Sequence, residues 1–199
     1  MCRAHYVEFS SMHVIRAALL CLLSLVSATA LAADGPDPEL LELLRIAAND
    51  AESFGDKFDA QVWLTDMSTR LGRTVEDPEE RLAILRNVHF EATRAELAPE
   101  LVLAVIDVES NFDHYAISVA GARGLMQIMP FWLDELGRPE DNLLHIGTNL
   151  RYGCTILKHY LDIEKGNLPR ALGRYNGSLG KRTYPNKVLD KLRLKWFRI

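Results

Sequence analysis

The feature that most constrains the fold is the run Leu101–Ile106 (LVLAVI), which is apolar with no polar face. A helix of this composition is stable only where other elements cover it on all sides. Pro99 suits the first turn of such a helix, because proline needs no hydrogen-bond partner there. The run therefore predicts a buried central helix around which the rest of the chain packs.

The predicted helix ends at an acidic residue, Glu109. Val102, Val105 and Ile106 lie on the same helical face, because residues three, four and seven apart stack above one another. No basic residue lies within one turn of Glu109 in the sequence. Desolvation and the negative end of the helix dipole should raise its pKa and leave a proton to donate. The alternative is a glutamate that emerges into solvent where its helix ends.

Four motifs follow one another in a fixed order along the chain. They are Glu109-Ser110, then Gly121–Pro130 (GARGLMQIMP), then Asn149 with Gly153, and then Ala171 with Tyr175-Asn176. In this order the motifs resemble the soluble lytic transglycosylase family, which shares its fold with goose-type lysozyme. The chain departs from the family pattern at Ile156, where a tyrosine is usual, and at Gly177-Ser178, which replaces Ala-Gly.

The resemblance implies a predominantly α-helical α+β fold of the lysozyme-like kind, with a small β segment near the cleft and extra N-terminal helices. It implies that Glu109 is the catalytic residue, that peptidoglycan glycan strands are the substrate, and that no cofactor is needed. In the family the conserved tyrosine of the last motif points toward the acid, which here is Tyr175. The predicted substrate-binding residues are Ser110, Met126, Gln127, Tyr175, Asn176 and Tyr184.

In the family the stretch 121–130 lines the glycan cleft, so the resemblance implies an apolar contact for Met126 and a hydrogen bond for Gln127. The alternative for Met126 is ordinary core filling. Tyr184 is added as a further candidate for lining the cleft. Its alternative is an aromatic residue that simply begins a helix.

The number of carboxylates bears on the reaction class. Ordinary glycosidases use two carboxyl groups held about 5 to 9.5 Å apart. Here only Glu109 falls in a matched motif, since Asp107 lies on another face of the helix and Asp113 in the following loop. The family reaction needs one, because the C6 hydroxyl of N-acetylmuramic acid attacks its own anomeric carbon and leaves a 1,6-anhydro end. Two alternatives remain: a goose-type hydrolase in which Asp113 activates water, and a non-catalytic peptidoglycan-binding protein.

Residues 1–32 are expected to be a cleaved signal peptide. Within them, 12–32 combine a basic residue, an apolar stretch and small residues before Ala32, and the stretch is too short for a comfortable membrane span. Lipidation at Cys21 is not expected, because two leucines precede it. Only Cys154 remains after cleavage, so no intramolecular disulfide is expected and Cys154 should be a small buried residue. These features predict a periplasmic protein.

Beyond the signal, 33–98 are expected to be a helical segment packed on the catalytic core, and 99–199 the core itself. With 48% hydrophobic and 25% charged residues, the chain can bury a sizeable core. The periodicity predicts helices from about Leu40 to Ala51, Phe58 to Leu71, Asp77 to Ala92 and Ile146 to Leu161, a shorter one after Pro130, and helices ending at Tyr175 and starting near Tyr184. Asp77 should cap its helix with Glu80 completing a capping box.

Charge and histidine spacing exclude other classes of function. Without residues 1–32 the net charge is about −5, which gives no electrostatic case for nucleic acid. The four remaining histidines show no metal-ligand spacing and are expected to be polar surface residues. The basic tail from Lys191 to Arg198 is expected to be a terminal helix with a solvated basic face. No particular protein partner is indicated.

Overall fold

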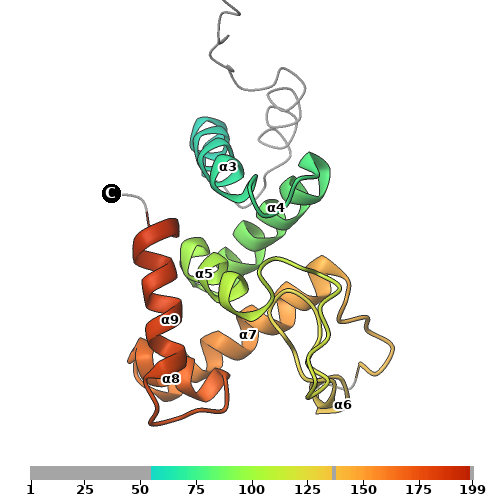
Figure 1. Ribbon diagram of the computed structural model, residues 1–199, viewed down its shortest axis with the longest axis vertical. Coiled ribbons are helices and arrows are strands. Elements are labelled where there is room, and N and C mark those ends of the chain that lie inside the picture. The colour runs from blue at the N-terminus through green and yellow to red at the C-terminus, as the bar shows by residue number, and fades with distance from the viewer. Residues whose placement is uncertain (1–54, 136–137, 198–199) are drawn as a thin grey trace, which may run out of the picture. The chain divides into compact units, whose positions relative to one another are not determined.

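The computed structural model describes residues 55–135 and 138–197, which are mainly helical (Figure 1). The helices are α3 (Lys57–Leu71), α4 (Pro78–Arg94), α5 (Pro99–Glu109), α6 (Phe131–Glu135), α7 (Ile146–Ile163), α8 (Leu168–Tyr175) and α9 (Thr183–Lys191), which continues into the short π-helix η1 (Leu192–Trp196). The predicted predominance of helix is confirmed. The predicted helix over Leu40–Ala51 and the predicted signal peptide lie outside the described residues.

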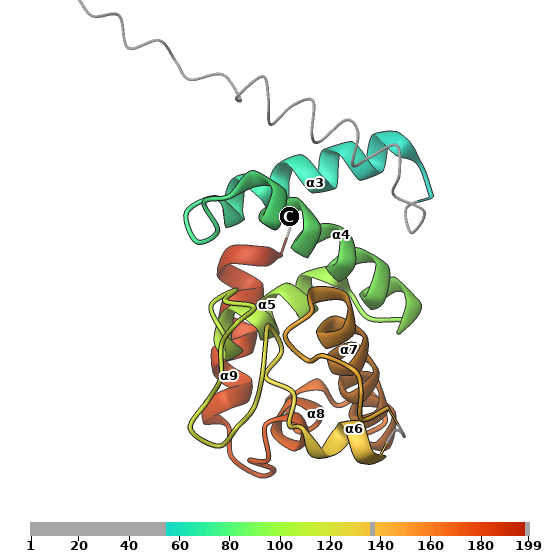
Figure 2. The same ribbon diagram turned by 90° about the vertical axis from the view of Figure 1, so that its right-hand side faces the viewer.

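Helix α5 forms the centre of this helical assembly. Every residue of Leu101–Ile106 is buried, and Pro99 stands in the first turn, as predicted. Helices α4 and α9 and the π-helix η1 pack against α5, while α7 joins α4 to α8. Figure 2 shows α5 enclosed between α4 above it and α9 beside it. The apolar run is thus covered from several directions, which is what its composition requires.

Helix α4 begins as the sequence predicts, with one difference. The Asp77 side chain accepts a hydrogen bond from the Glu79 N–H, and Pro78 occupies the first turn. Glu80, expected to complete a capping box, instead has its Oε1 2.6 Å from Nδ1 of His114. A tertiary partner has therefore replaced the local one. The face of this helix that packs in the core carries the buried residues Leu82, Leu85, Val88 and Ala92.

Helix α3 ends at Leu71, one residue before Gly72, as predicted. Met67 and Leu71 are buried, but Phe58, the apolar residue at which the periodicity begins this helix, is 71% exposed. Phe58 lies in the first turn of α3, where none of the described helices covers it. Helix α3 packs against α4 and η1, so the described part of 33–98 contacts the helices that follow it.

The β segment is smaller than expected. The described residues contain no extended strand, and the loop after α5 carries only two isolated antiparallel bridges, Ile117 with Arg123 and Arg123 with Ile128. Gly121 and Gly124 both have positive φ, +88° and +73°, a backbone conformation that glycine adopts without strain. The motif therefore forms a compact turn that folds back on itself.

The C-terminal tail differs from its prediction. Trp196 is fully buried, and the amino groups of Lys191 and Lys195 lie 2.5 and 2.8 Å from the carboxylate of buried Asp107. The basic residues of this segment therefore do not form one solvated face. No local sequence pattern predicts the contact, because Asp107 precedes Lys195 by 88 residues.

Several smaller predictions can also be compared with the structure. Cys154 is buried, and burial raises the pKa of its thiol. Two histidines are not the surface residues expected: His89 stacks edge-on to Trp63, with burial lowering its pKa to about 4, and His114 pairs with Glu80. In residues 55–135 and 138–197 there is no helix long and apolar enough to cross a membrane and no cluster of metal-ligating side chains.

Candidate active site

The site is built where α5 ends. Ser110 caps the helix, and its N–H donates to the carbonyl of Ile106. Asn111 and Phe112 then adopt left-handed backbone conformations, with φ of 50° and 67°, which is uncommon for a bulky residue. The buried ring of Phe112 packs 5.4 Å from Trp196 and holds this sharp reversal in place. Backbone strain of this kind is typical of functional sites.

Glu109 projects from the last turn of α5 into a largely apolar environment. The Tyr184 hydroxyl, from the first turn of α9, donates to Glu109 Oε1 at 2.6 Å. Burial raises the pKa of Glu109 above its ordinary value of 4.5, and the hydrogen bond from Tyr184 offsets part of that rise. The raised pKa predicted from the helical face is thus confirmed. A carboxyl group in this state can hold a proton and release it to a bound molecule.

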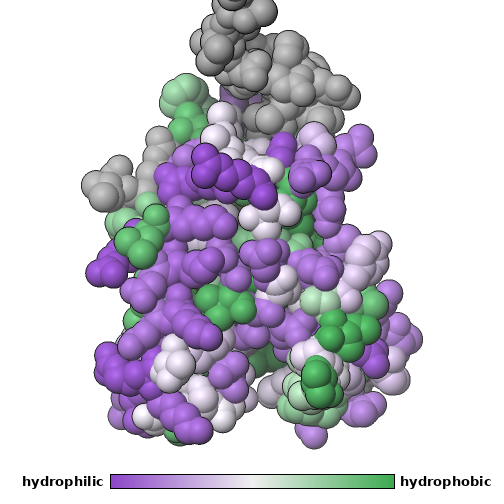
Figure 3. All heavy atoms as spheres, viewed as in Figure 1, coloured by the Kyte–Doolittle hydropathy of each residue, from purple (hydrophilic) through white to green (hydrophobic). Residues whose placement is uncertain are grey.

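The turn 121–130 forms the opposite side of the site from α8 and α9. Ser110 Oγ donates to the carbonyl of Leu125 at 2.8 Å, and the Tyr175 hydroxyl donates to the carbonyl of Met126 at 2.7 Å. Two consecutive carbonyls of the turn are therefore held by residues that flank Glu109 in space. In Figure 3 a hollow divides the lower part of this face, with the turn and α6 on one side and α8 on the other.

A buried amide anchors the same turn to α7. Asn149 is 1% exposed, and its Oδ1 accepts from the Met126 N–H at 2.8 Å. Its Nδ2 donates to the carbonyls of Arg123 and Leu143, both at 2.8 Å. A Cβ on Gly124 would lie 2.4 Å from that nitrogen, so this residue must be glycine for the amide to fit. Asn149 was noted in the sequence only as part of the family motif, and its role as an anchor was missed.

Met126 differs from its prediction as an apolar glycan contact. Its side chain is 0% exposed and packs against Gly153, where an added Cβ would lie 2.2 Å from the sulfur. The side chain fills the core beneath the site, as its structural alternative stated, and the main-chain carbonyl is what the residue offers to Tyr175. Met129 is half-buried and is the more accessible methionine of the motif.

Gln127 and Asn176 lie at the surface of the site region. Gln127 has a positive φ of 50°, and its Nε2 donates to the carbonyls of Gly124 at 2.9 Å and Ala116 at 3.2 Å. Its side-chain amide nitrogen therefore stabilises the turn. Asn176 caps α8 and is exposed. Their predicted contacts with a glycan stay predictions.

Both tyrosines lie close to Glu109, the position that the resemblance implies for Tyr175, but their hydroxyls donate to different groups. Tyr175, which the resemblance directs toward the acid, donates its hydrogen bond to Met126, although burial and the nearby charge of Glu109 both raise its pKa. Tyr184 is the direct partner of Glu109, and its pKa is raised well above 10 by burial and by that carboxylate. Both phenols are therefore neutral donors beside Glu109, one to the carboxyl group and one to the turn.

Neither of the other nearby acids is free to act with Glu109. Asp107 is buried and bound by Lys191 and Lys195. Asp113 is exposed, as expected, and its Oδ1 accepts from the Tyr115 N–H at 2.8 Å within its own turn. The site as described is therefore built around one carboxyl group.

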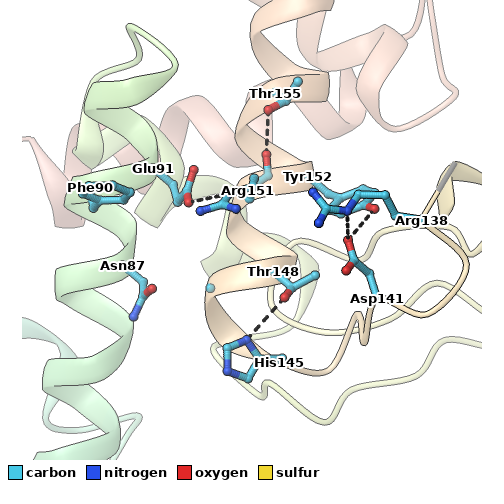
Figure 4. Close-up of a pocket in the computed structure, with 11 residues that line it drawn as sticks. Asn87, Phe90, Glu91, Arg138, Asp141, His145, Thr148, Arg151, Tyr152 and Thr155 are labelled. Carbon is cyan, nitrogen blue, oxygen red and sulfur yellow. Dashed lines mark hydrogen bonds and ion pairs between the residues drawn. The ribbon is translucent and has the colours of Figure 1, made fainter. Parts of the chain in front are cut away.

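A separate hollow of about 550 Å³ lies between α4 and α7 (Figure 4). Its acidic groups are paired within the protein: Glu91, which is buried, binds Arg94 and Arg151, and Asp141 accepts from the Tyr152 hydroxyl at 2.8 Å. The Glu91–Arg151 pair joins α4 to α7, and together these contacts give each carboxylate of the hollow a partner. The hollow is therefore a place where helices are held together, and its carboxylates are not candidates for a second catalytic acid.

Comparison with known proteins gives three findings. Residues 86–192 match the family described as Transglycosylase SLT domain. A curated relative, the "Transglycosylase" of Enterobacteria phage PRD1, is 32% identical over 105 residues, which are 49% of this chain and 38% of that protein. A solved structure of an inactive mutant of lytic transglycosylase Slt from Pseudomonas aeruginosa aligns with 81% of this chain and 32% of its own, at 23% identity and a TM-score of 0.43.

The chain thus spans about a third of the length of these relatives, 38% of the phage protein and 32% of the solved structure. The family match nevertheless covers more than half of the chain, from the middle of α4 to the start of η1, and includes every motif around Glu109. The chain belongs to the Transglycosylase SLT domain family.

Proposed function

We propose that this protein is a peptidoglycan lytic transglycosylase that cleaves the β-1,4 bond between N-acetylmuramic acid and N-acetylglucosamine and leaves 1,6-anhydro-muramic ends. The observation that carries the proposal is Glu109, a desolvated carboxyl group with a raised pKa, held by Tyr184 in the family's motif. Family membership and the name of the phage relative support the activity and the peptidoglycan substrate.

In this reaction Glu109 acts twice. Because Tyr184 donates to Oε1, the acidic proton of the neutral group is held by Oε2. Oε2 protonates the glycosidic oxygen as the bond to the anomeric carbon breaks, with the N-acetyl group assisting departure. The carboxylate then accepts the proton of the C6 hydroxyl as that oxygen bonds to the anomeric carbon. The acid is regenerated and no water is consumed.

The geometry gives less support to the two alternatives. A hydrolase needs a second group to activate water, and Asp113 is exposed and engaged in its own turn. A protein that only binds glycan gains nothing from a carboxyl group in a desolvated setting, which costs stability whenever the group is charged.

We also propose that the protein acts in the periplasm after removal of residues 1–32. The support is the order of basic, apolar and small residues in 12–32. N-terminal sequencing of the protein recovered from the periplasmic fraction should begin at Ala33, and an unprocessed N-terminus would contradict this proposal.

Two matched substitutions test the catalytic assignment. Glu109→Gln keeps the size and the hydrogen-bond acceptor but removes the transferable proton, so release of soluble muropeptides from purified sacculi should fall about 10²- to 10⁴-fold with folding unchanged. Asp113→Asn is the control and should stay within a few fold of the wild type. Equal losses in both variants would favour the hydrolase, and near wild-type activity of Glu109→Gln would remove the residue from its role.

A further inference from the structure

A second buried carboxylate lies two residues before Glu109 on a different face of α5. Asp107 is 5% exposed and is contacted by three groups of the C-terminal segment: Oδ2 accepts hydrogen bonds from Lys195 Nζ at 2.8 Å and Trp196 Nε1 at 3.1 Å, and Lys191 Nζ forms an ion pair with Oδ1 at 2.5 Å. Burial is the largest single influence and would raise the pKa of Asp107, but the hydrogen bonds and positive charges of the two lysines together outweigh it, and the pKa is lowered. The carboxylate is therefore charged and bound on both oxygens.

The π-helix explains how three donors so close in sequence reach one carboxylate. In an α-helix Lys191 and Lys195 share a face, while Trp196 is turned about 100° away. In η1 the Phe197 N–H instead donates to the carbonyl of Leu192, five residues back, and the wider turn brings Trp196 to the same side. Such turns are rare and frequently occur at functional sites.

The face that binds Asp107 is continuous with the face that binds Glu109. Tyr184 and Lys191 are seven residues apart, so they lie on one side of α9, with fully buried Val188 between them. One face of α9, which packs against α5, therefore carries Tyr184 at the acid, Val188 in the core and Lys191 at Asp107. The position of α9 along α5 decides whether the Tyr184 hydroxyl reaches Glu109.

We propose that Asp107, Lys191 and Lys195 form a clamp that fixes α9 along α5 and so positions the Tyr184 hydroxyl on Glu109. The inference rests on the proposed function, in which Glu109 is the acid. The three clamp residues are positioning residues that act through Tyr184. Stability alone does not require them, because a buried ion pair replaced by well-packed apolar residues is often no less stable.

Other charged groups near the clamp provide the controls. A cavity of about 550 Å³ beside it is lined by Lys187 and Asp190 as well as by the clamp residues. Glu109 is faced by Tyr175 from α8 and Tyr184 from α9, with Asp107 on its own helix. Lys187→Met is the matched control, since Lys187 shares the cavity and the helix but makes no described contact with Asp107.

The test uses two clamp variants that change the local charge in opposite directions. Asp107→Asn removes a negative charge and Lys195→Met a positive one, so Coulomb effects alone would lower the pKa of Glu109 in the first and raise it in the second. If the clamp positions Tyr184, both variants loosen a hydrogen bond that lowers this pKa. Both should then raise the pKa of Glu109, as Tyr184→Phe does, while Lys187→Met leaves it unchanged.

The pKa of Glu109 is measured by NMR titration of the full chain carrying isotope-labelled glutamate, so the readout does not depend on activity. Asp107→Asn leaves two lysines without their partner and is the variant at greater risk of unfolding. Lys195→Met keeps Lys191 and Trp196 on Asp107, and Lys195→Arg should restore the wild-type pKa. Shifts of opposite sign in the two clamp variants, or an unchanged pKa in folded Lys195→Met, would overturn the clamp.

Turnover on peptidoglycan gives the second readout. A misplaced Tyr184 should lower kcat about 10- to 100-fold in Lys195→Met with KM little changed, because the clamp touches no substrate. If the wild type releases no muropeptides, the proposed function fails, but the titration still decides the clamp. If the wild type is active and Lys195→Met keeps full kcat, the clamp fails and the proposed function stands.

Discussion

Replacing Asn149 with alanine removes the anchor between α7 and the turn 121–130. Three hydrogen bonds are lost, and the Met126 N–H and the carbonyl of Leu143 are left facing the vacated space, while the carbonyl of Arg123 still accepts from the Ile128 N–H. A hydrogen bond contributes about 1 kcal/mol net, and a buried group left unsatisfied costs about 1 to 3 kcal/mol. We expect Asn149→Ala to lower the free energy of unfolding by about 3 to 5 kcal/mol, a large part of the roughly 5 to 15 kcal/mol typical of a domain.

Urea unfolding followed by circular dichroism measures this loss as a lower midpoint with an unchanged slope. Asn87→Ala is the matched control, because Asn87 is only partly buried and its amide donates within its own helix, to the carbonyl of Ala83. The control should lose less than about 1 kcal/mol. If Asn149→Ala lowers the free energy of unfolding no more than Asn87→Ala does, the Asn149 amide does not hold the turn and the reasoning is refuted.

Two further predictions concern stability. The pKa of Asp107 is lowered below its ordinary 3.8, so its contribution to the free energy of unfolding is present above that pH and is lost as the pH falls through the lowered pKa. The urea midpoint of the wild type should therefore fall more steeply below about pH 4 than that of Asp107→Asn. Parallel curves for the two proteins would contradict this. Gly124→Ala should lower the free energy of unfolding by about 3 kcal/mol or more, and Gly121→Ala by about 1 to 2 kcal/mol. Both residues have positive φ, but only at Gly124 would a Cβ meet other atoms within 4 Å. Equal losses in thermal unfolding would contradict the clash.

Local sequence patterns predicted the central helix of this molecule and the environment of its acid. The apolar run before Glu109 specified a buried helix, and the apolar face beneath the carboxyl group specified its raised pKa, because both follow from helical periodicity alone. The structure confirms the predominantly helical fold class that the motifs implied. The extent of the β segment was overestimated, because the turn after Gly121 closes on itself before a strand can form.

Contacts between distant segments could not be read from such patterns. The lysines of the tail looked solvated because their partner, Asp107, lies in another helix. Tyr175 and Tyr184 were both candidates, but which of them reaches the acid depends on how α9 lies along α5. Met126 lies in the core because Gly153 of α7 leaves room for it, a relation that links two motifs through space.

The measurement that tests the central claim most directly is the chemistry of the new glycan ends. Sacculi digested by the protein in water enriched in the heavy oxygen isotope should yield muropeptides that end in 1,6-anhydro-N-acetylmuramic acid. These products are one water lighter than hydrolysis products, carry no heavy oxygen and resist borohydride reduction. Mass spectrometry separates the two outcomes. Reducible muramic ends that carry the heavy isotope would contradict a reaction run by Glu109 alone and make Asp113 the first residue to test as a second catalytic group.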